Sequence, residues 1–229
     1  GYQVMSINTL FKLMWLRDNC PKAIRAGNRW LMMPGLIELR LGAEEHVDPT
    51  SASTTMAMDL SNRDWSSKLL GLAGLDPGFF PEWREPGTVV GQVSGKAARA
   101  TGMPSGTPVL AGGHDTPFAL IGSGASRREA MLSSGTWEIL TFRANSFKPT
   151  KEGFQGGAIF EADAARGMWD PQVLMMGSGV LEWIRSCFFS EIPQTDYDAL
   201  ERLGREVPPG SRGVVVLPSF VSDSGPNRQ

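Results

Sequence analysis

The chain has few cysteines, no long apolar run and no surplus of basic residues, and each shortage excludes a class of protein. Its 229 residues include two cysteines, Cys20 and Cys187, which lie far apart and outside any C-x-x-C or other metal-ligand spacing. This usage fits a reduced, cytoplasmic protein best. No apolar run approaches the roughly 18 residues that span a bilayer, and the start lacks the basic-then-apolar order of a signal peptide. We therefore expect no membrane partner.

Charge is nearly balanced, because 22 lysines and arginines face 24 aspartates and glutamates, for a formal net charge of −2. Such a chain has no basic excess to attract nucleic acid, and we expect none as a partner. The 41% of hydrophobic residues and 20% of charged residues are typical of a globular protein that is long enough to bury a core. Both ends look cut, so we expect an internal piece of a longer protein.

Hydrophobic spacing predicts the first elements of the fold. Ile7, Leu10, Phe11 and Met14 recur at helical spacing and predict an amphipathic helix over residues 7–19. The polar cluster 48–53 indicates a turn or a helix cap, and most tryptophans are expected in the core. The remaining predicted elements are a helix over 64–72, strands over 89–93 and 109–111, a helix over 95–101, a two-stranded hairpin within 130–143, a helix from 177 to about 188 with an apolar face, and a strand over 214–217.

Two short segments carry the chemistry, and the first follows the strand at 109–111. Gly112 and Gly113 lead through His114 to Asp115, and Pro117 then opens a helix, so Asp115 or Thr116 is the natural N-cap. The helix dipole favours an ionised carboxylate there. The two glycines leave little side-chain bulk, so a substrate could reach Asp115. The alternative is that Asp115 only caps the helix.

The second segment is the bend 133–136 between two runs of strand formers. Its Gly135 and Thr136 could admit a polyphosphate to backbone N–H groups and a hydroxyl, although a plain hairpin is the alternative. A base and a phosphate cradle together indicate phosphoryl transfer to an alcohol. This interpretation requires Asp115 and the bend to face one cleft. His114 could hydrogen-bond a sugar hydroxyl, or simply pack beside the strand end.

At these residues the chain resembles the FGGY carbohydrate kinases, which belong to the larger actin-like and hexokinase-like ATPase group. The resemblance covers nearly the whole chain and rests on four motifs in order: residues 8–19, residues 48–53 followed by Asp59 and Trp65, residues 112–119, and residues 134–136. It implies an α/β, RNase H-like fold. Residues 1–128 would be the C-terminal part of the sugar-binding N-terminal domain, and residues 129–229 an incomplete nucleotide-binding C-terminal domain.

The resemblance also implies a role for each site residue. Asp115 would be the general base that takes a proton from the sugar hydroxyl. His114 and Thr116 would contact the sugar beside it. Four further residues would contact the nucleotide, the last two of which stand where the family often has a glycine and a glutamine: Gly135, Thr136, Ser178 and Glu182. ATP and Mg²⁺ are the implied cofactors, with no protein metal site because the phosphates largely hold the metal.

Within the family, Gly-His-Asp-Thr followed by Ser-Ser-Gly-Thr-Trp-Glu-Ile-Leu most resembles the branch that acts on deoxy-sugars. The implied reaction converts L-fuculose to L-fuculose 1-phosphate, with L-rhamnulose as the second choice. Xylulose and ribulose remain alternatives, as does a non-catalytic, kinase-like module that binds sugar. The implied partners are therefore a small sugar and ATP, and a homo-oligomer stays open.

Overall fold

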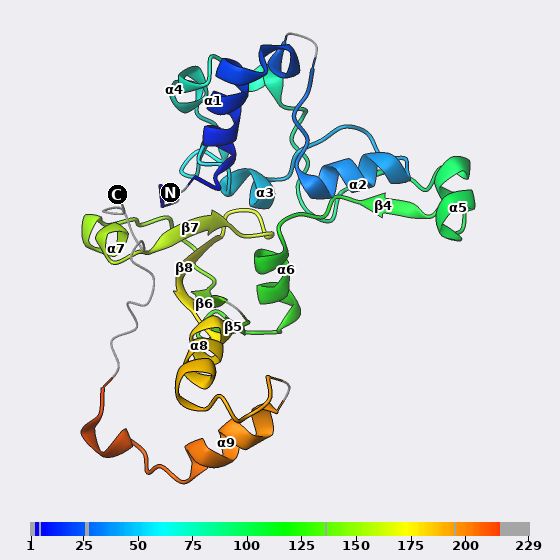
Figure 1. Ribbon diagram of the computed structural model, residues 1–229. Coiled ribbons are helices and arrows are strands. Elements are labelled where there is room, and N and C mark those ends of the chain that lie inside the picture. The colour runs from blue at the N-terminus through cyan, green and yellow to red at the C-terminus, as the bar shows by residue number, and fades with distance from the viewer. Residues whose placement is uncertain (1–2, 5, 26–27, 136, 195, 216–229) are drawn as a thin grey trace.

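The structure is a computed structural model that describes residues 3–4, 6–25, 28–135, 137–194 and 196–215 (Figure 1). Residues up to 122 contain more helix than strand. Their helices are α1 (Thr9–Asn19), α2 (Met33–Leu41), α3 (Pro49–Ser53), α4 (Ser67–Leu72), α5 (Gly95–Thr101) and α6 (Asp115–Gly122), with short 3₁₀ turns at Pro21–Ile24 and Pro77–Phe79. Two antiparallel strand pairs interrupt them, β1 (Met58–Asp59) with β2 (Asp64–Trp65) and β3 (Val89–Gln92) with β4 (Pro108–Leu110).

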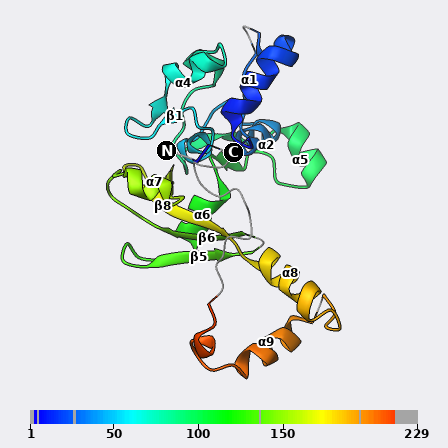
Figure 2. The same cartoon turned by 60° about the vertical axis from the view of Figure 1, so that its left-hand side comes forward.

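The later part of the chain forms a four-stranded antiparallel sheet in the order β5-β6-β8-β7. Its strands are β5 (Ala130–Ser134), β6 (Trp137–Phe142), β7 (Ile159–Ala162) and β8 (Trp169–Met176). Helix α7 (Lys151–Gln155) lies in the connection to β7, and α8 (Ser178–Phe188), α9 (Tyr197–Arg205) and a 3₁₀ turn at Ser211–Gly213 follow the sheet. In Figures 1 and 2, α8 and α9 extend away from the sheet, on the side opposite α1 and α4.

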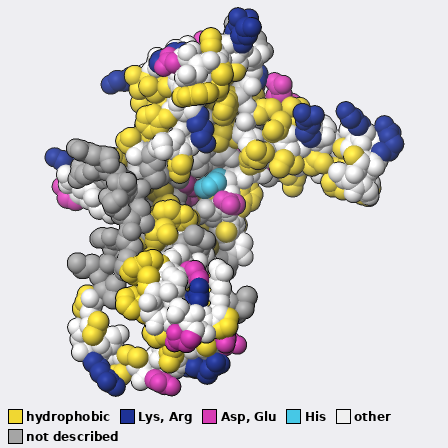
Figure 3. Space-filling view, in the orientation of Figure 1, with side chains coloured by type: hydrophobic (Ala, Val, Ile, Leu, Met, Phe, Trp, Pro, Cys, Tyr) yellow, Lys and Arg dark blue, Asp and Glu magenta, His cyan; other side chains and the backbone are white. Residues whose placement is uncertain are grey.

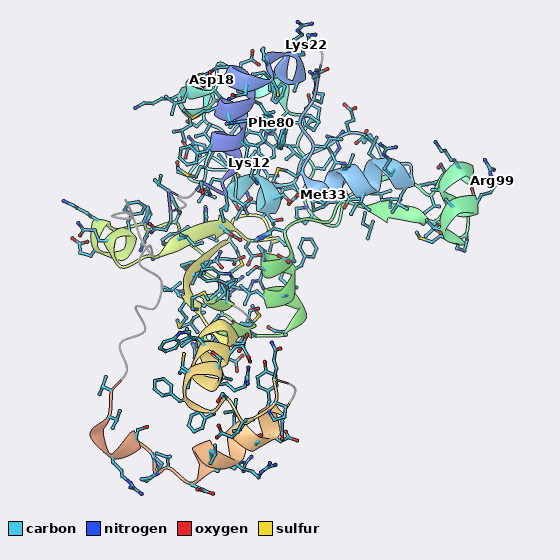
Figure 4. The ribbon with its side chains drawn as sticks, in the orientation of Figure 1. Lys12, Asp18, Lys22, Met33, Phe80 and Arg99 are labelled. Carbon is cyan, nitrogen blue, oxygen red and sulfur yellow. The ribbon has the colours of Figure 1, made fainter. Side chains whose placement is uncertain are left out.

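The main core lies in the helical part and reaches the sheet. Leu10 and Leu13 of α1 and Leu70 of α4 are fully or almost fully buried. Trp65 stacks on Phe80 with ring centroids 3.8 Å apart, and Phe80 lies within this helical group (Figure 4). Ala162 at the end of β7 belongs to the same cluster of buried side chains. The helical part and the sheet are therefore packed together through apolar contacts.

A smaller cluster of buried side chains holds the segment that leads to Asp115. Val90 of β3, Val109 of β4 and Ala97 of α5 pack together in an arm that ends at α5 (Figure 1). The predicted strand at 109–111 is present as β4, but it pairs antiparallel with β3 and leaves Leu110 half exposed. We expected a compact buried strand over 109–111, and Val109 and Ala111 are buried as expected, whereas Leu110 is not.

Helix α1 confirms the predicted first helix, although its buried face is different from the prediction. Asn8 occupies the N-cap position, yet its amide donates to the carbonyl of Thr54 instead of capping the helix. Leu10 is buried as predicted, whereas Ile7 lies before the helix and is 65% exposed. Leu13, which we did not assign to the buried face, is completely buried.

Local sequence patterns predicted several other elements closely. The helix at 95–101 and the hairpin of β5 and β6 are found as expected, with Ser134 opposite Glu138. The predicted helix over 64–72 starts later, because Asp64 and Trp65 form β2 and Ser66 caps α4 through the N–H of Leu69. The strand predicted over 214–217 is absent at residues 214 and 215, and residues 216–217 lie outside the described part.

Aromatic side chains depart most from the predicted core. Trp65 is buried as expected, but Trp15, Trp137 and Trp183 are about half exposed. Helix α8 forms where predicted, yet none of its residues is buried. On its apolar face, Val180 and Ile184 are only partly covered, and Trp183 and Phe188 are exposed. In Figure 2 the far end of the helix extends away from the sheet.

Both cysteines are exposed and free. Over the described ranges, the helices are all too short or too polar to cross a membrane.

Candidate active site

The helix that carries Asp115 begins one residue earlier than predicted. His114 is the N-cap residue, with extended backbone angles, and Asp115 is the first residue of α6. The Oδ1 atom of Asp115 accepts a hydrogen bond from the N–H of Thr116 at 2.8 Å. Pro117 falls in the first turn, where a missing N–H costs no helical hydrogen bond. The expected N-cap role therefore belongs to His114, and the Asp115 carboxylate projects from the first turn.

Gly112 and Gly113 are needed for a different reason from the one we inferred. A Cβ atom on Gly112 would lie 2.8 Å from Oε1 of Glu38, and one on Gly113 would overlap Oγ1 of Thr50 and lie 2.5 Å from Oδ1 of Asp48. Polar side chains of α2 and of the start of α3 thus fill the space that we assigned to a substrate. The predicted reason for access is therefore wrong, although the Asp115 side chain is itself 94% exposed, as a substrate would require.

Those polar side chains fix the backbone before Asp115. Glu38 accepts a hydrogen bond from the N–H of Gly112 at 2.8 Å, and its other oxygen lies 2.6 Å from Nε2 of the buried His46. Thr50 accepts from the N–H of His114 at 2.8 Å and donates to Asp48. The strand end is therefore held from α2 and from the start of α3.

Asp48 has the capping role that its sequence predicts. Its Oδ1 accepts from the N–H of Ser51 at 2.9 Å at the start of α3, and the same oxygen accepts from Thr50. Because Thr50 in turn holds the backbone of His114, the cap also contributes to the position of the candidate base. Helix α3 is buried throughout and contacts β7.

His114 lies between two carboxylates. Its Nδ1 is 3.0 Å from Oε2 of Glu161 on β7, and its Nε2 is 3.3 Å from Oδ1 of Asp115. The Glu161 side chain is 1% exposed, whereas that of Asp115 is 94% exposed. Figure 3 shows a histidine and an acidic side chain together on the surface between the helical part and the sheet. His114 thus lies between the buried carboxylate of Glu161 in the sheet and the exposed carboxylate of Asp115.

The pKa of His114 reflects these neighbours. Burial lowers the pKa of the imidazole, but the hydrogen bond to Glu161 and the negative charges of Glu161, Asp115 and Asp48 outweigh it. The result is a pKa above the ordinary value of 6.5. A neighbouring carboxylate is expected to have this effect on histidine.

Glu161 belongs to a buried acidic cluster that sequence reasoning missed. It pairs across the strands with Asp170 of β8, and Asp163 follows β7. Arg143 neutralises Asp163 through a contact of 2.6 Å. Burial, and after it the charge and hydrogen bond of Asp163, raise the pKa of Asp170 to about 9. At neutral pH, Asp170 therefore carries a proton, and the cluster holds fewer charges than its composition indicates.

The bend that we predicted to receive phosphate packs against the start of α8. The carbonyl of Gly135 accepts from the N–H of Ser178 at 2.8 Å, so two of the predicted nucleotide-binding residues are in contact. Gly177 allows this approach, because a Cβ there would lie 2.7 Å from the Gly135 carbonyl and 2.5 Å from Cγ of Glu138. Thr136 lies outside the described residues.

Glu182, the last predicted nucleotide-binding residue, lies one turn further along α8. Its Oε1 lies 2.7 Å from Nε of Arg185, which also donates to the carbonyl of Ile192 at 2.6 Å. The carboxylate is thus held by its own helix.

Strand register separates the two candidate parts of the site along the sheet. Glu161, the neighbour of His114, is opposite Asp170, whereas Trp137, which follows the bend, is opposite Met176. These positions on β8 are six residues apart, or roughly 20 Å along an extended strand. Asp115 lies on α6 and meets the sheet only through His114 and Glu161, so this interval along β8 is not itself the distance from Asp115 to the bend. The bound substrates would have to span the space between them.

Two further features bear on ligands. A cavity of about 460 Å³ is lined by Ala23, Asn28, Arg29, Leu31 and Glu45, and it contains none of the predicted site residues. No three His, Cys, Asp or Glu side chains of the described chain are grouped as metal ligands. Mg²⁺ that is bound with a nucleotide commonly retains water and phosphate ligands and takes only one or two protein carboxylates.

Comparison with known proteins identifies the family. Residues 1–122, which include Asp115, match the model of the FGGY family of carbohydrate kinases, N-terminal domain. The chain belongs to the FGGY family of carbohydrate kinases. The L-fuculokinase of Escherichia coli (strain K12) is 38% identical over 214 residues, which are 93% of this chain and 45% of that protein. The autoinducer-2 kinase of the same strain is 29% identical over 225 residues, covering 94% of this chain and 42% of the relative.

Solved structures of sugar kinases share the fold. The xylulose kinase from Rhodospirillum rubrum superposes with a TM-score of 0.79 at 24% identity, covering 94% of this chain and 44% of that one. The ligand-bound xylulose kinase from Lactobacillus acidophilus gives 0.82 at 20% identity, covering 95% and 44%. The predicted FGGY kinase fold is therefore confirmed. The chain spans somewhat less than half the length of these relatives.

Proposed function

We propose that this FGGY chain forms part of an ATP-dependent kinase that converts L-fuculose to L-fuculose 1-phosphate. The observation that carries the proposal is the exposed Asp115 carboxylate, which lies inside the region matched to the family and is held through only one of its oxygens. The 38% identity to L-fuculokinase supports the choice of sugar. In the chemical step, the sugar hydroxyl gives its proton to Asp115 while its oxygen attacks the terminal phosphorus of ATP, and ADP leaves.

The other site residues keep the roles that the resemblance implies, as proposals. Thr116 lies next to the base and would contact the sugar, whereas the sugar contact of His114 stays a prediction. The residues that would contact the nucleotide phosphates are Gly135, Thr136, Ser178 and Glu182. The hydrogen bond between Gly135 and Ser178 supports this proposal, because it places two of them side by side. Mg²⁺ would neutralise phosphate charge when it is bound with ATP.

The proposed division places a sugar-binding domain in residues 1–128 and an incomplete nucleotide-binding domain in 129–229. Sheet pairing supports it, because each of the three sheets draws its strands from one side of this boundary. The two parts also pack against each other, where α3 contacts β7, His114 contacts Glu161 and the Trp169 indole donates to the carbonyl of Leu60. Cytoplasmic location and oligomeric state stay predictions.

A panel of acceptors tests the function. The complete gene product, with whatever segments it carries beyond these 229 residues, is assayed for ADP formation with MgATP and L-fuculose, L-rhamnulose, D-xylulose, D-ribulose or autoinducer-2. We expect kcat/KM for L-fuculose to exceed that of each other compound by about tenfold or more, because buried groups that meet a hydroxyl discriminate against acceptors that lack or misplace it. A higher value for xylulose, or for autoinducer-2, would assign the chain to another branch.

A further inference from the structure

We propose that His114 acts as a doubly protonated positioning residue, which ties the Asp115 carboxylate to the buried Glu161 of the sheet. This inference rests on the proposed function, since it concerns the orientation of the candidate base. It also differs from the sugar contact predicted for His114, because both ring nitrogens already face carboxylates.

Geometry supports the doubly protonated form. Nδ1 lies 3.0 Å from Oε2 of Glu161 and Nε2 lies 3.3 Å from Oδ1 of Asp115. A neutral imidazole has one N–H donor and one acceptor nitrogen, so it would direct a lone pair at one of the two carboxylates. Only the imidazolium donates to Glu161 from Nδ1 and also presents a protonated, positively charged Nε2 to Asp115. Thr50 accepts a hydrogen bond from the backbone N–H of His114, so the backbone that carries the ring is also held in place.

Burial of Glu161 provides the reason for a cation at this place. Its side chain is 1% exposed, and its Oε1 has no hydrogen-bond partner among the described residues. A buried carboxylate is costly unless a cation or hydrogen-bond donors compensate it. Asp170, which is opposite Glu161, keeps its proton, and Asp163 is paired with Arg143. Glu161 is therefore the buried carboxylate of this cluster that the charge of His114 compensates.

Every element packed around the ring contributes negative charge. Asp48 faces it from the start of α3, Glu161 from β7 and Asp115 from α6. The raised pKa of His114 agrees with this arrangement. In the folded protein, a histidine of this kind keeps its charge at a pH where an exposed one has partly lost it.

Positioning follows from the way Asp115 is held. Its Oδ1 accepts a hydrogen bond from the N–H of Thr116 and lies in ion-pair contact with the His114 ring, while Oδ2 has no partner in the part of the chain that the structure describes. The free oxygen is the one that would take the proton of the sugar hydroxyl. When His114 loses its charge, Asp115 loses this ion pair and keeps only the hydrogen bond from Thr116, so it can turn away. We therefore expect effects on kcat rather than on the KM for sugar.

Titration of the ring tests the protonation state directly and needs no catalysis. The complete gene product is labelled with ¹⁵N and ¹³C at histidine, and the resonances lost in His114→Gln identify the ring. We expect both nitrogens to be protonated below the ring pKa, a pKa above 6.5, and a lower pKa in Glu161→Gln. A pKa below 6.5 in the unmodified protein overturns the proposal, and so does a value that Glu161→Gln leaves unchanged. The unmodified protein alone supplies the first outcome even where a variant fails to fold.

Kinetics test the positioning role. We expect His114→Gln to lower kcat by about 10- to 100-fold and to change the KM for L-fuculose by less than about threefold. We also expect kcat of the unmodified enzyme to fall as pH rises through the pKa of His114 found by titration, and this fall to be missing in His114→Gln. A rise in KM with unchanged kcat would overturn positioning and favour a sugar contact.

His46→Gln is the matched control. It removes the other histidine–carboxylate pair of the chain, in which His46 lies 2.6 Å from Glu38. In this variant, kcat should still fall at the same pH as in the unmodified enzyme. Failure of this inference is distinguishable from failure of the proposed function. If the titration result is negative while Asp115→Asn abolishes phosphorylation, only the role of His114 is wrong.

Discussion

Replacement of Asp115 by asparagine is expected to lower kcat for L-fuculose phosphorylation by about 10²- to 10⁴-fold, the usual contribution of a general base. The carboxamide keeps the shape of the side chain and can still accept from the N–H of Thr116. It cannot take the proton of the attacking hydroxyl. Affinity for sugar and nucleotide should change little, since Asp115 is 94% exposed and contributes no buried packing. Steady-state ADP release by the complete gene product measures the effect.

Asp198→Asn provides a control for this substitution. Asp198 is also an exposed aspartate in the first turn of a helix, and its helix α9 lies away from α6 in both ribbon views. We expect its kcat to stay within about threefold of the unmodified value. If Asp115→Asn kept more than about a tenth of the activity, Asp115 would not be the base. If the unmodified protein bound L-fuculose but consumed no ATP, the non-catalytic module would be the better interpretation.

The second large effect concerns stability and comes from Asp170. Its pKa is about 9 in the folded protein against an ordinary value of 3.8, so the folded state holds a proton that the unfolded state releases over this interval. The free energy of unfolding should therefore fall by up to about 1.4 kcal/mol for each pH unit of rise between those two values. Asp170→Asn removes this loss, because an amide has no proton to release and can still donate to Asp163. Near pH 8 the free energy of unfolding of the variant should exceed that of the unmodified protein by a few kcal/mol, as an order of magnitude.

Urea unfolding at several values from about pH 5 to about pH 8 measures this difference. The gap between the two proteins should widen steadily as pH rises. Asp163→Asn is the contrasting variant, because it leaves Arg143 without its carboxylate partner and should destabilise the protein by about 3–5 kcal/mol. Parallel stability curves for Asp170→Asn and the unmodified protein would show that Asp170 is ionised when folded.

Local patterns explain what the sequence could predict about this fold. Helix α5 carries its own cap, since Ser94 accepts from the N–H of Ala97, and the hairpin of β5 and β6 is set by neighbouring residues. Helix α1 was placed well for the same reason. Its buried face was not, because burial depends on α4 and on the loop around Phe80, which lie far away in sequence. Helix α8 shows the limit most clearly, since its apolar pattern is present but none of its residues is buried.

In the candidate site, too, residues marked by local sequence patterns could be predicted, and residues that reach the site from distant segments could not. Asp115 and Gly135 stand out in the sequence because each follows a strand at a glycine-containing turn. Glu38 and Glu161 do not, because they meet the site across 74 and 47 positions of the chain. Glu38 did offer a signal, as a lone carboxylate among the apolar residues of α2. The glycines before Asp115 were recognised but misinterpreted, since their free space is taken by side chains from distant segments.

The most direct test of the account is a crystal structure of the complete gene product with L-fuculose and a non-hydrolysable ATP analogue. We expect the terminal hydroxyl of the sugar to lie about 2.6–3.2 Å from the Asp115 carboxylate, with the terminal phosphate against residues 135–136 and in line with that hydroxyl. A sugar bound out of reach of Asp115, or a terminal phosphate held by another segment, would contradict the proposed site.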